Sequence, residues 1–159
     1  MSMPSYQKRA LLLDEILTEG IKLFKRMLAS EEDLRKQLIK GDHRAIMESE
    51  QERKELQLAI NALEDKRKAL IPAGTGMQKY IKSWIGKSKQ PILMGKLNEL
   101  QVILKEMRAI HEVNQVLMAE RLRFSKEIQE KVLSQTAYYD QKGRLNKEEK
   151  PSKRIDRNC

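Results

Sequence analysis

The apolar residues of this 159-residue chain recur in steps of three and four, which is the spacing of one face of an α-helix. A first helix is predicted from Ser5 to just before Gly41, because glycine suits the left-handed position that closes a helix. Gly20 and Glu31 interrupt its apolar seam and are expected to be two weak points. The seam consists of Leu13, Leu17, Phe24, Met27, Leu34 and Leu38.

A second helix is predicted from Asp42, whose carboxylate can cap the first exposed amides, to about Leu70. The connection of one or two residues at Gly41 and Asp42 forces these two helices to lie antiparallel. After Pro72 stops the second helix, a short basic amphipathic helix is predicted over 77–85, and it contains Trp84. Packing over the open end of the hairpin is its favoured role, and contact with an anionic membrane or a partner is the alternative.

The longest predicted helix runs from Pro91 to Tyr139, on the order of 70 Å, against roughly 40 to 50 Å for the first two. Its apolar face narrows beyond Asn114, where we expect it to overhang its neighbours and to offer apolar surface to another molecule. The predicted fold is therefore all-α: an antiparallel helical hairpin plus a long third helix, in a coiled-coil-like three-helix bundle. Residues 1–143 are expected to form one domain and 144–159 a disordered basic tail.

Two polar residues, His111 and Asn114, lie on the apolar seam of the long helix. Either they fix the register of packed helices, as a buried asparagine does in a coiled coil, or they begin a binding surface. The sequence favours neither. The residues predicted to bind a partner on this helix are Ile110, His111, Asn114, Leu117, Met118, Arg121, Phe124 and Ile128.

The net charge of +9 raises nucleic acid as a partner, but the placement of the charge argues against it. Most of the excess comes from residues 75–90, which hold four lysines and no acidic residue, and from the segment after Gln141. The long helices carry mixed signs and are nearly neutral. A helix that binds duplex nucleic acid is expected to show a continuous basic stripe, so nucleic acid is disfavoured.

Chemistry-bearing residues are few: two histidines, His43 and His111, and one cysteine, Cys159. No carboxylate or second histidine lies three or four residues from His111 to build a metal site, and no glycine-rich phosphate loop is present. We therefore predict a protein that is not an enzyme and uses no cofactor. The single cysteine and the lack of a signal peptide or a long apolar run favour a cytoplasmic location.

Three local features resemble those of the FlgN-type flagellar export chaperones. They are Arg67 near the end of the second helix, the stretch 110–117 with its polar pair followed by leucine, and Tyr139 with Gly143 four residues later. The resemblance covers roughly residues 5–143. This chain departs from the family pattern at His111, which stands where the family has a first asparagine, and at Gln115, which stands where glycine is common.

The resemblance implies a cytosolic chaperone that binds the aggregation-prone terminal segments of hook-associated proteins and delivers them to the cytosolic domain of the flagellar export gate. It also implies that the C-terminal portion binds these clients and that Tyr139 docks to the gate, with neighbouring Tyr138 as the alternative. An overhanging apolar helix face agrees with this function, because a disordered amphipathic segment can fold on such a face.

Two other classes of function stay open. The lysine-rich segment 76–90 and the basic tail would suit a protein that binds nucleic acid or an anionic membrane. A plain coiled-coil interaction protein, forming a homo-oligomer through the exposed third helix, is the other. The sequence does not identify the client among the hook-associated proteins, or the stoichiometry.

Overall fold

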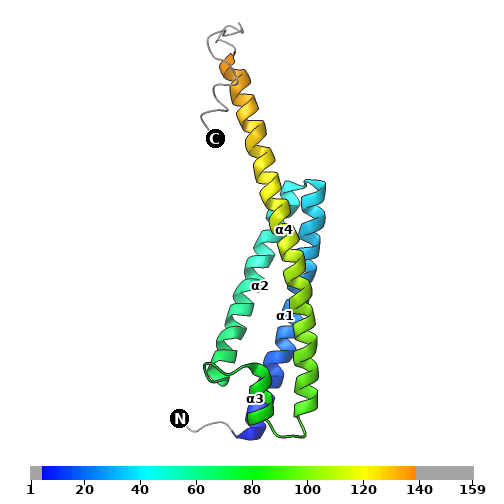
Figure 1. Cartoon of the computed structure of the whole chain (residues 1–159), viewed down its shortest axis with the longest axis vertical. Helices are drawn as coiled ribbons and strands as arrows, with labels where there is room; N and C mark the ends of the chain where they lie inside the picture. Colours follow the sequence, from blue (N-terminus) through cyan, green and yellow to red (C-terminus); the bar gives the residue numbers. More distant parts are fainter. Residues whose placement is uncertain (1–4, 139–159) are drawn as a thin grey trace. The chain divides into compact units, whose positions relative to one another are not determined.

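The computed structural model describes residues 5–138, and every regular element in that range is a helix. Figure 1 shows α1 (Tyr6–Lys40), α2 (His43–Leu70), α3 (Met77–Trp84) and α4 (Gln90–Tyr138). The all-α prediction is confirmed, and the predicted boundaries of the helices lie within one or two residues of those observed. The chain divides into two compact units, Met1–Asn114 and Gln115–Cys159, so that α4 contributes to both. The predicted tail over 144–159 lies outside the described residues.

The link between α1 and α2 makes a tight antiparallel hairpin in unit 1 (Figure 1). Gly41 closes α1 with a φ of 77°, a left-handed conformation that glycine adopts without a steric penalty. Asp42 then caps α2, because its carboxylate accepts a hydrogen bond from the Ala45 amide at 3.1 Å. Both capping predictions are confirmed, and two residues suffice to reverse the direction of the chain.

The seam of α1 is more continuous than the sequence indicated. Gly20 is buried, and a Cβ atom added there would lie 3.5 Å from the Leu63 side chain and 3.7 Å from that of Leu100. These are ordinary van der Waals distances, so Gly20 lies within the buried seam that α1 presents to leucines of α2 and α4, and its description as a weak point stays a prediction. Leu23 takes the buried place that the sequence pattern gave to Phe24, which is half-buried. The shift by one residue follows from the period of 3.6, which drifts against strict heptad spacing.

A first core cluster lies where α3 closes the end of the hairpin. Tyr80, Ile81 and Ile85 are buried there. They are packed in one cluster with Leu13 and Leu17 of α1 and with Leu93 and Leu97 of α4. This packing confirms the favoured role of the short basic helix.

The aromatic side chains of α3 lie against α1 as well. The rings of Tyr80 and Trp84 are stacked with centroids 6.4 Å apart, and the Arg9 guanidinium lies 4.9 Å from the Trp84 ring. Burial raises the pKa of the Tyr80 hydroxyl, because the phenolate would lose its hydration. The apolar face of α3 is thus buried in the core of unit 1.

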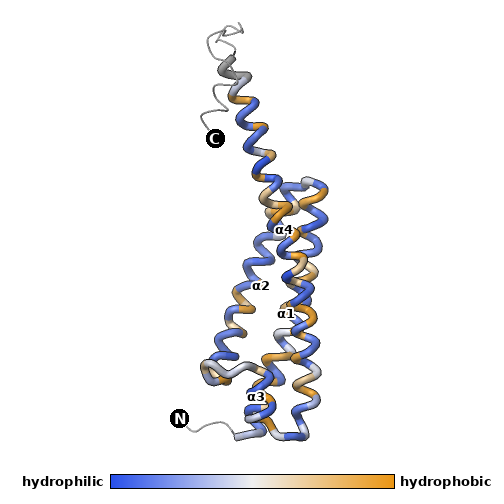
Figure 2. The backbone as a smooth tube through the Cα atoms, viewed as in Figure 1, coloured by the Kyte–Doolittle hydropathy of each residue, from blue (hydrophilic) through white to orange (hydrophobic). Residues whose placement is uncertain are grey.

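A second core cluster joins α1 to α2 farther along the hairpin. It contains Ile16, Leu23, Met27, Leu56 and Leu63, with Met107 of α4 packed against it. Figure 2 shows hydrophobic positions alternating with hydrophilic ones along these helices, as expected for elements that bury one face. Unit 1 is held together by aliphatic packing along the seam and by the aromatic group at one end.

Replacing Ile81 by alanine should test how far α3 contributes to this core. The side chain is fully buried, so the cavity left behind should lower the free energy of unfolding by about 2–5 kcal/mol. Urea denaturation followed by circular dichroism measures the change. Leu58→Ala, at an exposed position of α2, is the control and should change it by less than about 0.5 kcal/mol. Equal effects of the two substitutions would show that α3 is not part of the cooperative core.

Candidate functional site

A buried polar cluster joins α1 to α4 within unit 1. The Asn114 amide donates to the backbone oxygen of Glu31 at 2.8 Å and to the Glu31 carboxylate at 2.7 Å. His111 Nδ1 lies 3.3 Å from the other carboxylate oxygen. The Glu31 side chain is 9% exposed and Asn114 is 0% exposed, so water contributes little at the centre of the cluster.

The cluster joins a polar residue on the apolar seam of α1, Glu31, to a polar residue on the apolar seam of α4, Asn114. Glu31 falls four residues after Met27 and three before Leu34, which is a seam position of α1. The sequence pattern predicted only an interruption of the seam at Glu31 and did not predict its contacts with α4. It also showed no carboxylate for His111, because it shows neighbours along the chain rather than across helices. One signal was present in the sequence: Glu31 and Asn114 are polar residues at positions where the pattern of each helix calls for an apolar one.

The hydrogen bonds of Asn114 are directional and therefore fix how α4 lies along α1. A one-turn slip would leave a buried carboxylate without its donor, which is costly in an apolar seam. Asn114 Oδ1 is also buried, and it has no hydrogen-bond partner among the described residues. This burial supports the role in helix register for Asn114, and its role in partner binding stays a prediction.

The second candidate surface belongs to unit 2 and consists of one side of α4. Between Gln115 and Ser134 no described residue is buried. Phe124 is 64% exposed, Ile128 45% and Met118 37%, while Leu117 and Arg121 are half-buried. Leu117, Arg121, Phe124 and Ile128 are spaced by four, three and four residues, so they share one side of the helix. We call these four residues and Met118 the apolar face of unit 2.

The remaining predicted partner-binding residues lie elsewhere. Ile110 is half-buried in unit 1, and His111 is about half exposed beside the polar cluster. Tyr139 lies outside the described residues. Tyr138 is the last residue of α4. The structure therefore brings Asn114 and His111 together around Glu31, and it places the predicted residues from Leu117 to Ile128 in unit 2.

Arg67, which carries part of the family resemblance, lies on α2 beside Glu64. Its Nε donates to the Glu64 carboxylate at 2.8 Å, and a second, shorter contact joins the same two groups. This hydrogen-bonded pair lowers the pKa of the Glu64 carboxyl, an effect that partial burial opposes. The pair lies within one helix, three residues apart, and therefore adds local support to the end of α2.

Residues 5–138 contain no group of three or more histidine, cysteine or acidic side chains placed to hold a metal ion. Within that range, none of the helices combines the length and the apolar character needed to cross a membrane.

Comparison with known proteins identifies the family of the chain. The family model described as FlgN protein matches residues 12–147. The chain belongs to the FlgN family. No curated protein and no solved structure matches it. The FlgN match begins within α1 and extends beyond the end of α4, so both the polar cluster and the apolar face lie inside it. FlgN membership carries a general role as a flagellar export chaperone, in a family of chaperones rather than of enzymes.

Asn114→Ala should show how much the polar cluster contributes to the free energy of unfolding of this FlgN-family chain. Removing the amide leaves the buried Glu31 carboxylate without its closest donor, so the free energy of unfolding should fall by about 1–3 kcal/mol. Glu32→Ala, at an exposed neighbouring position, should change it by less than about 0.5 kcal/mol. The double variant Asn114→Ala with Glu31→Ala should lose less stability than the sum of the single losses. Strictly additive losses would contradict a direct interaction.

Proposed function

We propose that this chain is a cytoplasmic flagellar export chaperone for hook-associated proteins. It binds their disordered amphipathic terminal segments on the apolar face of unit 2 and delivers them to the cytosolic domain of the export gate. The observation that carries the proposal is the exposure of that face on a helix of a FlgN-family chain. Large apolar side chains left in water on one side of a helix are typical of a surface that a partner covers.

The size of the face suits a client segment that folds on binding. Residues 115–134 span about 30 Å of helix, which is room for several turns of a second helix alongside. Full burial of a side chain such as Phe124 or Ile128 contributes about 1.5–3 kcal/mol. Ordering the client opposes this gain, so binding should be moderate and reversible, as delivery to a gate requires.

The charges around the face favour a protein client over a polyanion. Glu120 and Arg123 form an exposed pair at 2.8 Å, and Arg121, Lys126 and Glu127 lie between or beside the apolar positions. Such mixed charges give no continuous basic track for a phosphate backbone. The face should therefore bind its client with a weak dependence on salt concentration, whereas polyanion binding weakens steeply as salt increases.

Phe124→Asp should abolish capture of a hook-associated terminal segment, because it places a charge at the centre of the apolar face. Leu117→Asp should act in the same way. The loss should exceed about tenfold in Kd, measured by fluorescence anisotropy with a labelled terminal segment. Val116→Asp is the matched control: Val116 is also exposed, but at 100° per residue it lies about 100° from Leu117 and about 160° from Met118, outside the apolar face. It should retain binding to within about twofold.

Helicity and thermal stability should be nearly unchanged in these variants, because the replaced side chains are not buried. If Phe124→Asp binds the client as the wild type does, the apolar face is not the client surface. If it unfolds the protein, Phe124 belongs to a core. Equal losses in Phe124→Asp and Val116→Asp would indicate a general effect of charge on unit 2.

Tyr139→Ala should separate client binding from docking to the gate. A tyrosine at the end of a helix can anchor a partner, since it supplies apolar area and one hydroxyl at a low entropy cost. The variant should bind the client with unchanged affinity and should bind the isolated cytosolic domain of the export gate more weakly when loaded with client. Paired titrations of wild type and variant against both partners measure this. Unchanged gate affinity would remove Tyr139 from the mechanism, and Tyr138→Ala would then test the neighbouring residue.

A further inference from the structure

A cleft of about 570 Å³ lies in unit 1 between the first turns of α1, the first turns of α4 and the loop that precedes α4. It is separate from both surfaces described above. Buried Ala10 and Leu93 line it together with exposed residues of α1 and α4. We call it the α1–α4 cleft.

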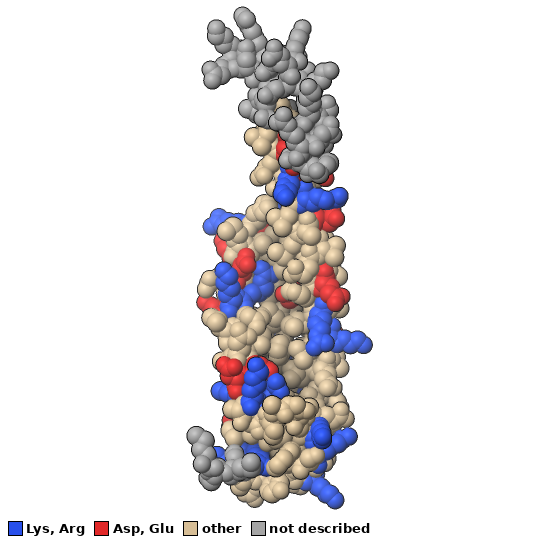
Figure 3. All heavy atoms as spheres, turned by 60° about the vertical axis from the view of Figure 1, so that its left-hand side comes forward, with Lys and Arg blue, Asp and Glu red and all other residues tan. Residues whose placement is uncertain are grey.

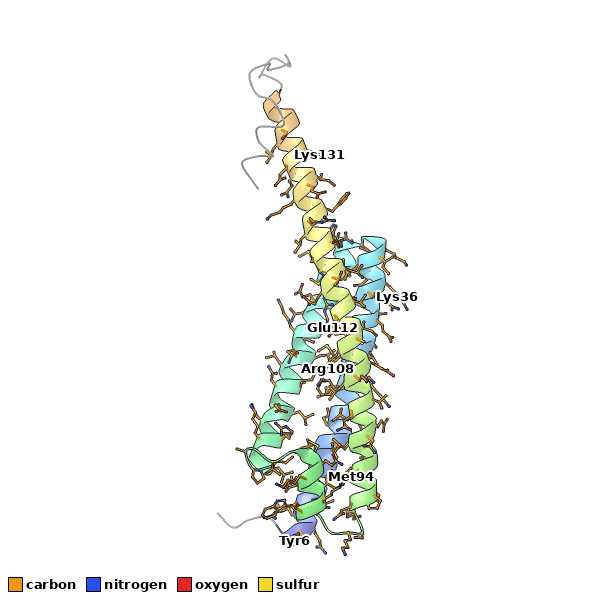
Figure 4. All side chains as sticks on the ribbon, in the orientation of Figure 1. Tyr6, Lys36, Met94, Arg108, Glu112 and Lys131 are labelled. Atoms are coloured by element: carbon orange, nitrogen blue, oxygen red, sulfur yellow. The ribbon has the colours of Figure 1, made fainter. Side chains whose placement is uncertain are left out.

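Three large apolar side chains around this cleft are left in water. Tyr6 is 63% exposed, Leu11 64% and Ile92 55%, although a buried core lies directly behind them. Figure 4 shows Tyr6 at the start of α1. The Arg9 guanidinium lies 5.7 Å from the centre of the Tyr6 ring and 4.9 Å from that of the Trp84 ring, so it links the Tyr6 side chain to α3. Apolar side chains gathered around a concave site are typical of a binding site rather than of an ordinary surface.

Two lysines and one carboxylate give the described lining of the cleft a formal charge of +1. Lys89 and Lys96 line it, and Asp14 is the one acidic residue among the described lining residues. Asp14 already pairs with Lys96, which also donates to the Thr18 hydroxyl at 2.9 Å. On the face drawn in Figure 3, basic side chains but no acidic ones show around the end of unit 1 that carries α3. Because Lys96 is paired with Asp14, the positive charge offered by the cleft is that of Lys89, one of the four lysines of segment 75–90.

We propose that the α1–α4 cleft is a docking site for an acidic segment of another protein that carries a large apolar side chain. The apolar side chain enters the cleft between Tyr6, Leu11 and Ile92. A carboxylate of the segment lies near Lys89, at the basic end of unit 1, where charge complementarity gives specificity and speeds association. A membrane fits less well, because the exposed apolar side chains surround a concave site, whereas a flat bilayer requires them on a protruding surface.

This inference does not depend on the proposed client site, since the cleft and the apolar face of unit 2 share no residue. It gives a role to Lys89 of the basic segment, which the core packing does not explain. The lysines of 75–90 make this end of unit 1 positive, and the exposed apolar residues give it a contact surface.

The test uses the full chain and two synthetic fluorescein-labelled peptides. One alternates aspartate with leucine and phenylalanine, and the other has asparagine in place of each aspartate. Measured by fluorescence anisotropy at low salt, the aspartate peptide should bind at least about tenfold more tightly than the asparagine peptide, and the difference should shrink as salt is added. Equal affinity for the two peptides, or no binding of either, would overturn the proposal.

Variants locate the binding. Leu11→Asp and Lys89→Glu should each weaken binding of the aspartate peptide by about tenfold. Their controls on α2, Leu58→Asp and Lys68→Glu, make the same changes at exposed positions outside the cleft and should retain affinity to within about twofold. Phe124→Asp should also retain it. A loss in the controls as large as in the cleft variants, or no loss in the cleft variants, would show that the cleft is not the site.

Two further measurements keep the outcome decisive. Far-ultraviolet circular dichroism checks the fold of each variant, and Ile92→Asp replaces Leu11→Asp if the latter unfolds. Sedimentation with vesicles of phosphatidylserine and phosphatidylcholine tests the other class of partner. Vesicle binding that Leu11→Asp and Lys89→Glu abolish, and with which the aspartate peptide does not compete, would assign the surface to a membrane and overturn the proposal. Failure of the vesicles to sediment the wild type supports it.

Discussion

The arrangement of unit 1 depends on the hydrogen bonds that Asn114 makes with Glu31. Aliphatic packing brings helices together but tolerates a slip along the seam, because leucine and isoleucine offer similar surfaces from turn to turn. A buried amide bonded to a buried carboxylate has one satisfied position. This interaction converts general attraction between α1 and α4 into a defined register, and Asn114 is also the last residue of unit 1.

The helices and their ends could be predicted because the information for them is local. Gly41, Asp42 and Pro72 carry chemistry that acts within one turn, and the structure follows it. The contacts between helices could not be predicted in the same way. Gly20 and Glu31 looked like faults in the seam of α1, yet Gly20 lies against two leucines and Glu31 binds Asn114. Their meaning depends on residues about 40 to 80 positions away, which a periodic pattern does not reveal.

For the two surfaces as well, local spacing could be predicted from the sequence, whereas contacts between helices could not. The apolar row from Leu117 to Ile128 was visible as spacing in the sequence, and its exposure required the structure. The cleft at Tyr6, Leu11 and Ile92 was invisible, because these residues lie on no common seam and meet only when α4 packs beside α1. One of the two departures from the family resemblance, His111, also has a defined contact in the structure. His111, which stands where the family has asparagine, still reaches the Glu31 carboxylate, so the position keeps a polar contact with α1.

The two-residue link between α1 and α2 has a consequence for how the chain folds. Closing so short a loop costs little entropy, and the contacts of the hairpin are close in sequence, so the hairpin can form early. During synthesis it can emerge and associate before α4 is complete, because domains assemble from the N-terminal side as the chain lengthens. Its inner leucines must then wait for α3 and α4 to cover them. Among the described helices, α4, which carries the apolar face of unit 2, is thus the last to be made, after the hairpin against which its first half packs already exists.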